Sequence, residues 1–264
     1  MNGGERIAEA FASARADGRR AALMPYLMGG FPDLEASREV GLAYADAGAD
    51  LVELGVPYSD PLADGPVIHA AAVSALRGGA RFDGVLGAAR AIARRVPVVL
   101  MCYSNLIYVR GIDRFADALV AAGLSGVIVP DLPVDEAAEI LEACDQRGLA
   151  LVPLVAPTTP ADRLARIGAQ ARGFLYTVSL TGTTGERAAV DGELPQVIAR
   201  AAAVTDVPVA VGFGIGTPDQ AAAAAAAGAD GVIVGTRLVR AAAEAQDPAG
   251  AVRDLVRDFA AALR

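Results

Sequence analysis

Three segments of the chain share one junction, in which an alanine-containing stretch ends in Ala-Gly and passes directly into an aliphatic run. They read AGADLV at residues 47–52, AGLSGVIV at residues 122–129 and AGADGVIV at residues 227–234. Glycine just past the end of a helix commonly closes it, because glycine adopts the left-handed backbone conformation without strain. A short β-branched run then reads as a buried strand, so each junction predicts a helix that leads straight into a parallel strand.

Five further aliphatic runs bring the number of predicted strands to eight. They cover residues 22–28, 96–103, 149–155, 173–179 and 207–211. Each run is followed by a segment compatible with a helix, and no linker or low-complexity tract divides the chain. Eight alternating strand and helix units in roughly 250 residues predict an α/β fold of the (β/α)8 TIM barrel type, forming a single domain over residues 1–264. A doubly wound parallel sheet is the main alternative, because its strands are equally apolar.

The composition favours small, soluble ligands. The chain is 54% hydrophobic and carries a formal net charge of −8 at pH 7, whereas nucleic acids and anionic membranes require a clustered basic face. Cys102 and Cys144 are too few for a disulfide framework and read as reduced, packed thiols. Residues 1–20 lack the apolar core of a signal peptide, and no stretch is long enough to span a bilayer, so we expect a cytoplasmic protein.

The chain contains no lysine. All 23 of its lysine-or-arginine positions are arginine, and it has one histidine. Schiff-base aldolases, pyridoxal-phosphate enzymes and Walker-type nucleotide sites each depend on a lysine amine, so these chemistries are excluded for this chain. One histidine and two cysteines cannot form the usual zinc clusters, and we expect no metal site. Carboxylates, hydroxyls, backbone amides and arginines remain for catalysis.

The segment LVELGVPYSDPLADGP, residues 51–66, places a carboxylate inside an otherwise aliphatic strand. An unpaired ionised carboxylate is costly to bury, so Glu53 is expected either to be paired or to have a raised pKa. A raised pKa suits a general acid and base near neutral pH, and Glu53 is therefore the first catalytic candidate. The alternative is a core carboxylate bonded to a neighbouring tyrosine or hydroxyl.

Three glycine-rich loops follow the last three predicted strands. They are Gly182-Thr183-Thr184-Gly185, Gly212-Phe213-Gly214-Ile215-Gly216 and Gly235-Thr236. Glycines let backbone amides approach an anion, and barrel phosphate sites lie in these late loops at helix N-termini. The set therefore predicts a phosphate site, although each loop alone is also compatible with ordinary turn chemistry.

Over essentially its whole length, the chain resembles the tryptophan synthase alpha subunit family. The most specific matches are residues 53–66 and Pro130-Asp131-Leu132-Pro133, with weaker support from residues 182–185 and 212–215. The resemblance implies a lyase in tryptophan biosynthesis, a barrel that cleaves indole-3-glycerol phosphate to indole and glyceraldehyde 3-phosphate without a Schiff base or metal. It also implies a beta subunit that carries pyridoxal phosphate, with no cofactor on this chain, and an α2β2 assembly.

The resemblance assigns a role to each candidate site residue. Glu53 matches the acid and base at the ring carbon and the hydroxyl, and Asp64 matches the carboxylate that receives the ring N–H proton. Substrate contacts are implied for Tyr26, Tyr176, Thr184, Gly185, Phe213, Gly214, Gly235 and Thr236, and beta-subunit contacts for Asp60 and Pro61.

Ordinary structural roles are the alternative for several of these residues. Asp64 could cap the helix expected near Val67, Asp60 could be a turn former, and aromatic residues at strand ends commonly pack in the core. Tyr103 is a further pocket candidate, and Asp131 could cap the following helix. His69 reads as structural.

Two departures from the family pattern affect loops near the expected site. The first strand is followed by Met28-Gly29-Gly30, and the sixth predicted strand is followed by a segment with Leu180 and Thr183. Residues 180–190, rich in Gly, Thr and charge, are the candidate for a lid.

Other functions remain open at this stage. A free-standing indole-3-glycerol-phosphate lyase would differ only in needing no beta subunit, and another phosphate-binding barrel isomerase would share the late glycine loops. The indole-glycerol-phosphate-forming synthase is disfavoured because it relies on a lysine. A non-catalytic, partner-binding barrel would not need both Glu53 and Asp64.

Overall fold

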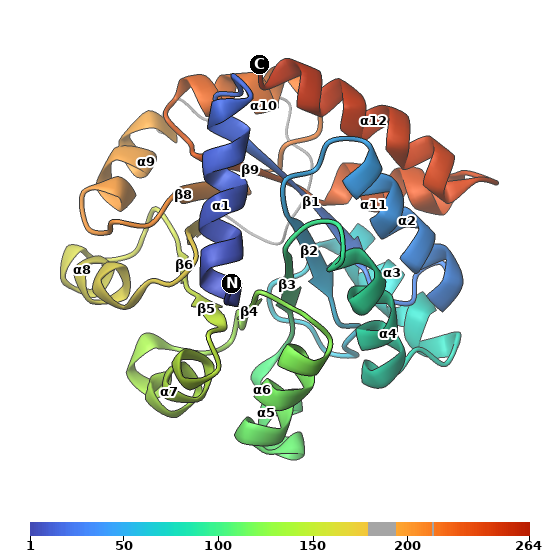
Figure 1. Ribbon diagram of the computed structural model, residues 1–264, viewed down its shortest axis with the longest axis horizontal. Coiled ribbons are helices and arrows are strands. Elements are labelled where there is room, and N and C mark those ends of the chain that lie inside the picture. Colours follow the sequence, from blue (N-terminus) through green and yellow to red (C-terminus); the bar gives the residue numbers. More distant parts are fainter. Residues whose placement is uncertain (179–193, 213) are drawn as a thin grey trace.

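A computed structural model of the chain describes residues 1–178, 194–212 and 214–264. Its strands form one parallel sheet that curves into a barrel surrounded by helices (Figure 1). The strands are β1 (Ala22–Met28), β2 (Val52–Gly55), β3 (Val98–Met101), β4 (Gly126–Ile128), β5 (Ala150–Val152), β6 (Leu154–Val155), β7 (Leu175–Val178), β8 (Val209–Gly212) and β9 (Gly231–Val234). The predicted TIM barrel is confirmed.

The helices alternate with the strands along the chain. They are α1 (Gly3–Ala16), α2 (Leu34–Asp46), α3 (Pro66–Arg77), α4 (Phe82–Ile92), α5 (Ser104–Arg110), α6 (Ile112–Ala121), the 3-10 turn η1 (Val134–Glu136), α7 (Ala138–Gln146), α8 (Ala161–Gln170), α9 (Leu194–Ala202), α10 (Pro218–Ala226), α11 (Thr236–Glu244) and α12 (Pro248–Ala262). Among the residues described, no helix has both the length and the apolarity to cross a membrane.

The strand order explains how eight predicted strands become nine segments. The order is β5-β4-β3-β2-β1-β9-β8-β7-β6, so β5 and β6 stand at the two ends of the sheet, yet only Pro153 separates them in sequence. Proline has no backbone N–H to donate to a neighbouring strand, and the predicted run of residues 149–155 is interrupted there. Its first half pairs with β4 and its second half with β7, so this run joins the two ends of the barrel.

Side chains alternate between two apolar layers. Met24, Val99 and Ile128 belong to an inner cluster, whereas Leu23 and Leu100 belong to the larger outer cluster between the strands and the helices. This alternation follows from the two-residue period of a strand. Because both faces are buried, the strands read as continuous aliphatic runs rather than as alternating polar and apolar residues.

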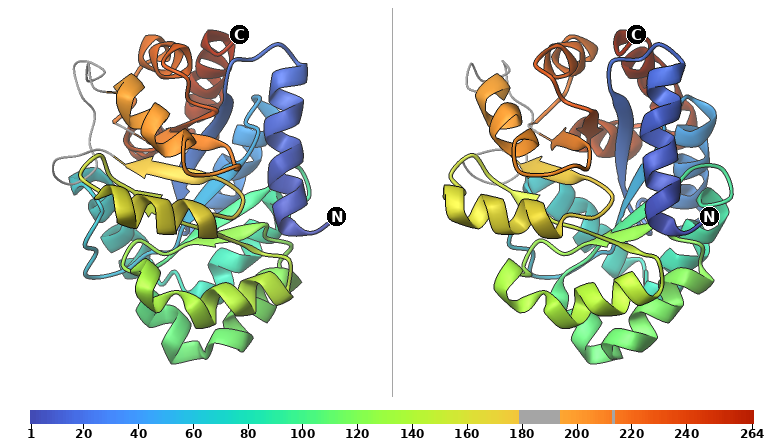
Figure 2. Two further views of the ribbon diagram at one scale, coloured as in Figure 1. Left: turned by 90° about the vertical axis from the view of Figure 1, so that its left-hand side faces the viewer. Right: turned by 60° about the vertical axis from the view of Figure 1, so that its left-hand side comes forward.

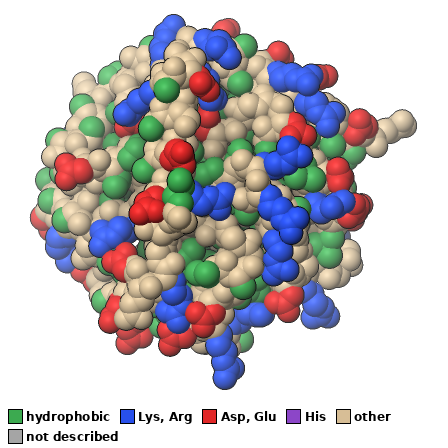
Figure 3. Space-filling model, viewed as in Figure 1, with side chains coloured by type: hydrophobic (Ala, Val, Ile, Leu, Met, Phe, Trp, Pro, Cys, Tyr) green, Lys and Arg blue, Asp and Glu red, His purple; other side chains and the backbone are tan. Residues whose placement is uncertain are grey.

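Helix α1 closes the end of the barrel at which the strands begin (Figures 1 and 2). Ile7 and Phe11 are buried in the inner cluster, and the Phe11 ring lies 6.0 Å from that of Phe174. Space-filling atoms viewed from this side show arginine and acidic side chains spread over the surface (Figure 3). With this end filled, the opposite end remains for a site.

The three Ala-Gly junctions are confirmed as helix ends. Gly48, Gly123 and Gly228 follow α2, α6 and α10 with φ values of 108°, 77° and 102°. After two of these junctions an aspartate side chain bonds the backbone of a neighbouring strand. Asp50 accepts the N–H of Leu23 in β1, and Asp230 accepts the N–H of Val209 in β8, each at 2.8 Å. The repeated motif thus sets both the end of a helix and the start of neighbouring strands.

Candidate functional site

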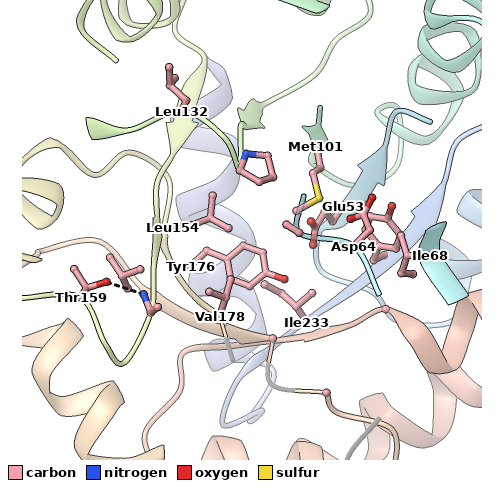
Figure 4. Close-up of a pocket in the computed structure, with 18 of the residues that line it drawn as sticks. Glu53, Asp64, Ile68, Met101, Leu132, Leu154, Thr159, Tyr176, Val178 and Ile233 are labelled. Atoms are coloured by element: carbon pink, nitrogen blue, oxygen red, sulfur yellow. Dashed lines mark hydrogen bonds between the residues drawn. The ribbon is translucent and has the colours of Figure 1, made fainter. Parts of the chain in front are cut away.

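A cavity of about 440 Å³ opens at the carboxyl ends of the strands, where barrel sites lie (Figure 4). Its lining is mainly apolar, but it includes the carboxylates of Glu53 and Asp64 and the phenols of Tyr26 and Tyr176. Four residues that were far apart in the sequence are therefore brought together around one space. Such a cavity suits a small molecule with an apolar part and a few polar groups.

Glu53 lies in the middle of β2, between Tyr26 of β1 and Val99 of β3 in the parallel register. Its side chain points into the cavity and is buried, with a residue exposure of 2%. Neither carboxylate oxygen has a hydrogen-bond partner within the described parts of the chain. The alternative of a core carboxylate satisfied by a neighbouring hydroxyl is therefore not supported.

Burial raises the pKa of Glu53 to about 8, with a further contribution from the negative charge of Asp64. Burial disfavours the charged form of a carboxyl group, and a nearby carboxylate acts in the same direction. At neutral pH Glu53 is mainly protonated. It can therefore donate a proton first and accept one afterwards.

Asp64 lies in the loop between β2 and α3, half-buried at the cavity wall. Helix α3 begins at Pro66 with Gly65 as its N-cap and no side-chain capping bond, so Asp64 does not cap it. Burial raises the pKa of Asp64, and the nearby His69 lowers it. His69 is itself exposed on α3.

Tyr26 and Tyr176 come from β1 and β7 and line the cavity from two sides. Burial raises the pKa of both phenols well above the ordinary value, so both remain neutral donors. Each hydroxyl crosses close to a glycine at a strand end: a Cβ on Gly55 would lie 2.1 Å from Tyr26 Oη, and a Cβ on Gly212 would lie 2.6 Å from Tyr176 Oη. These glycines leave the room that the two phenols occupy.

The late glycine loops contribute backbone to the same cavity. Gly214, Gly235 and Thr236 line it, whereas Thr184, Gly185 and Phe213 lie outside the described residues, as does the candidate lid at residues 180–190. Helix α11 begins at Thr236 without a side-chain capping bond, so its first amides are not capped by a side chain.

Helix α10 differs from α11 at its N-terminus. Thr217 and Gln220 form a reciprocal capping box, and the Gln220 side chain also accepts the N–H of Gly216 at 2.8 Å. The amides at the start of α10 are thus partly occupied within the protein. The N-terminus of α11 is therefore the better anion-binding site of the two, because its amides are uncapped and it carries partial positive charge.

Several cavity residues were not singled out from the sequence. The apolar wall consists of Ile68, Met101, Leu154, Val178 and Ile233 (Figure 4), and Arg163 and Thr159 lie at the same cavity. The wall residues sit within strands or a helix that read simply as core. For the wall residues other than Ile68, the only sequence signal is a position toward the carboxyl end of a predicted strand.

Two further candidates have other roles than those considered first. Tyr103 does not line the cavity; its hydroxyl accepts the N–H of Ala63 at 3.1 Å. Asp131 accepts bonds from the Ser104 N–H at 2.9 Å and the Ser104 hydroxyl at 2.7 Å, so it caps α5 rather than the helix that follows it. The cap therefore comes from the loop after the neighbouring strand β4.

Asp60 and Pro61 lie outside the cavity. Asp60 is exposed and accepts a bond from the Ser59 hydroxyl, whereas Pro61 is partly exposed. Within the described chain, no group of three or more His, Cys, Asp or Glu side chains is arranged to hold a metal ion. The chemistry available at the cavity is that of two carboxylates, two phenols, the Arg163 guanidinium, the threonine hydroxyls and backbone amides.

Comparison with known proteins identifies relatives of the whole chain. A family model described as tryptophan synthase alpha chain matches residues 11–262. The tryptophan synthase alpha chain of Synechococcus elongatus is 48% identical over 235 residues, covering 88% of each chain, and that of Rippkaea orientalis is 42% identical over 98% of each chain.

Comparison with solved structures identifies the same family. A chain of Mycobacterium tuberculosis tryptophan synthase superposes with a TM-score of 0.92 at 43% identity, covering 98% of both chains. A chain from the tryptophan synthase a2b2 complex of Pyrococcus furiosus superposes with a TM-score of 0.85 at 36% identity, covering 90% of this chain and 97% of the other. The protein is therefore an enzyme subunit that belongs to the tryptophan synthase alpha chain family.

Proposed function

We propose that this chain is a carbon–carbon lyase that cleaves indole-3-glycerol phosphate to indole and glyceraldehyde 3-phosphate. The observation that carries the proposal is Glu53, a buried carboxyl group with no bonded partner in the described structure, facing a largely apolar cavity. Without a lysine, the reaction has no Schiff base to use as an electron sink. The indole ring itself then has to take the electrons of the breaking bond.

The protonated Glu53 donates its proton to the ring carbon that bears the glycerol phosphate side chain. Asp64 accepts the ring N–H proton, and the product of these two transfers is an indolenine. The Glu53 carboxylate then takes the proton of the adjacent hydroxyl, the carbon–carbon bond breaks to give the aldehyde, and its electrons flow through the ring to nitrogen. Asp64 returns a proton to that nitrogen, which yields indole and restores both carboxyl groups.

The remaining parts of the cavity suit the two ends of this substrate. Ile68, Met101 and Ile233 provide an apolar wall of the kind that an indole ring requires. Gly235 and Thr236 place the start of α11 at the cavity, where backbone amides suit a phosphate monoester. Tyr26 and Tyr176 are proposed to contact the substrate between these ends.

Indole release from indole-3-glycerol phosphate by the purified chain tests this proposal. The substrate contains the same ring as the product, so released indole is separated from indole-3-glycerol phosphate by solvent extraction or chromatography before it is measured. Slow release that increases when a beta subunit is added supports an alpha subunit. Fast release that does not respond to the beta subunit would indicate a free-standing lyase, and no release under either condition would contradict the proposed reaction.

Replacing Asp64 by Asn is expected to lower kcat by roughly 10²-fold and to change KM much less. An amide cannot accept the ring proton, yet it keeps the size of the side chain. Steady-state indole release measures the effect, and Asp60→Asn provides the control, because Asp60 is exposed in the same loop. Equal activity of the two variants would remove Asp64 from the mechanism.

We further propose that Asp60 and Pro61 contact a beta subunit, which would carry pyridoxal phosphate in an α2β2 complex. Large apolar side chains are exposed on the elements next to this loop, with Leu62 at 79%, Val109 at 85% and Tyr108 at 52%. The Tyr103–Ala63 hydrogen bond holds the loop beside the start of α5, the helix that carries Tyr108 and Val109. Exposed apolar patches of this kind mark interaction surfaces.

Replacing Val109 by Glu is expected to weaken the affinity for a beta subunit by roughly tenfold or more and to leave the isolated chain's kcat unchanged. A charge on a surface that loses water on binding is costly. Val120→Glu is the control, because Val120 is also an exposed apolar residue, 46% accessible on α6. Calorimetric titration with a beta subunit measures both, and equal affinities would place the interface elsewhere.

A further inference from the structure

Tyr103 is a buried tyrosine whose hydroxyl is used by the protein rather than by the cavity. Its residue exposure is 5%, and its hydroxyl accepts the backbone N–H of Ala63, the residue immediately before Asp64. Asp64 itself has no side-chain hydrogen bond among the bonds of the described residues. The placement of its carboxylate therefore depends on how the backbone of its loop is held.

The anchor point is itself fixed on both sides. Before Tyr103, the N–H of Cys102 bonds to the Ile128 carbonyl at 3.1 Å, which continues the pairing of β3 with β4. After it, Ser104 is held by the carboxylate of Asp131 through two hydrogen bonds. Because the backbone is fixed on both sides of Tyr103, its hydroxyl is a rigid support for the loop to which it bonds.

The ring of Tyr103 makes a second contact with the same loop. The Tyr58 ring lies 4.8 Å from it between centroids. Tyr58 precedes and Ala63 follows the exposed residues Asp60 and Leu62, so Tyr103 contacts the loop before and after them. Of these two contacts, only the hydrogen bond lies next to Asp64.

We propose that Tyr103 is a positioning residue, whose hydroxyl holds the Asp64 carboxylate in the cavity beside Glu53 by accepting the Ala63 N–H. The inference rests on the proposed function, because it assigns Asp64 a part in the reaction. Catalytic groups lose efficiency when their supports are loosened, and a displacement of about 1 Å can cost up to 10²-fold in rate. A phenylalanine at this position keeps the ring and removes only the acceptor.

The test compares Tyr103→Phe with Tyr58→Phe, which removes a hydroxyl from the other ring of the same pair. Tyr103→Phe is expected to lower kcat for indole release by about tenfold with little change in KM, and Tyr58→Phe to leave both near wild type. A loosened loop exposes Asp64 to water, so the acid limb of the kcat/KM profile should also move to lower pH in Tyr103→Phe only. Similar values for the two variants, or a lower kcat with an unmoved acid limb, would overturn the proposal.

A second measurement needs no substrate and separates this inference from the proposed reaction. Carbon-13 NMR titration of the Asp64 carboxyl group, assigned with Asp64→Asn, reports its pKa in the wild type and in both tyrosine variants. A lower pKa in Tyr103→Phe alone supports the anchor even if the wild type releases no indole, which would contradict only the reaction. The same Asp64 pKa in all three proteins would overturn the anchor even if the wild type is active.

Discussion

Replacing Glu53 by Gln is expected to reduce indole release by roughly 10³-fold or more, the largest loss expected from any single substitution in this cavity. Glutamine keeps the shape of the side chain but can neither donate the proton to the ring carbon nor accept the proton of the hydroxyl. Both steps assigned to Glu53 are lost together. Single-turnover measurements with excess enzyme would report the chemical step without product release.

The pH profile gives the same prediction a second readout. Glu53 must begin in its protonated form, so kcat/KM of the wild type should fall above a pH of about 8, where Glu53 loses its proton. Asp64 must be ionised, which places the acid limb at the raised pKa of that group. In Glu53→Gln, any residual activity should lack the basic limb.

A control for this experiment is binding of the product-like ligand indole to the inactive variant. Because the chain lacks tryptophan, indole fluorescence reports binding directly. An indole affinity close to that of the wild type would show that the cavity is intact. Full activity in Glu53→Gln would assign the proton transfers to another group and leave the burial of Glu53 without a catalytic purpose.

The fold was predictable because its signals are local. Each Ala-Gly junction contains both the glycine that ends a helix and the strand that follows, and Gly48, Gly123 and Gly228 all have positive φ values. The interruption at Pro153 was not predicted, although a proline within a strand-like run is the usual sign of one.

The site was predictable only in part, because much of it depends on contacts between distant residues. Glu53 is conspicuous as a charge inside an aliphatic strand, but the absence of a partner for it depends on every neighbour around the barrel. Tyr103 contacts Ala63 across 40 positions of sequence, so no local pattern reveals that bond. Ile233 and Met101 look like other core residues until the closed barrel places them at the cavity.

The acid–base assignment is also consistent with the arrangement of charges. Two carboxyl groups in identical surroundings could share one proton, but neither would be set apart as the donor. Here Glu53 is buried, whereas Asp64 is only half-buried; burial raises the pKa of Asp64, and the nearby His69 opposes that rise. The two environments separate the groups into a proton donor and a proton acceptor.

The same burial should make the stability of the protein depend on pH in a specific direction. The folded pKa of Glu53, about 8, lies above the ordinary value of 4.5, so the folded protein binds one more proton than the unfolded chain between these values. The free energy of unfolding therefore falls as pH rises through this window, by up to about 1.4 kcal/mol per pH unit, and levels off above the folded pKa.

Between pH 5.5 and pH 8, the wild type is therefore expected to lose about 3 kcal/mol more unfolding free energy than Glu53→Gln, which has no proton to lose at this position. Urea titrations followed by circular dichroism at several pH values measure the difference, with coincident probes as the check on two-state behaviour. Glu139→Gln serves as the control, because Glu139 is exposed on α7 and should follow the wild type. Parallel pH dependences for wild type and Glu53→Gln would show that Glu53 is ionised in the folded protein at neutral pH, and it could not then be the proton donor that begins the cleavage.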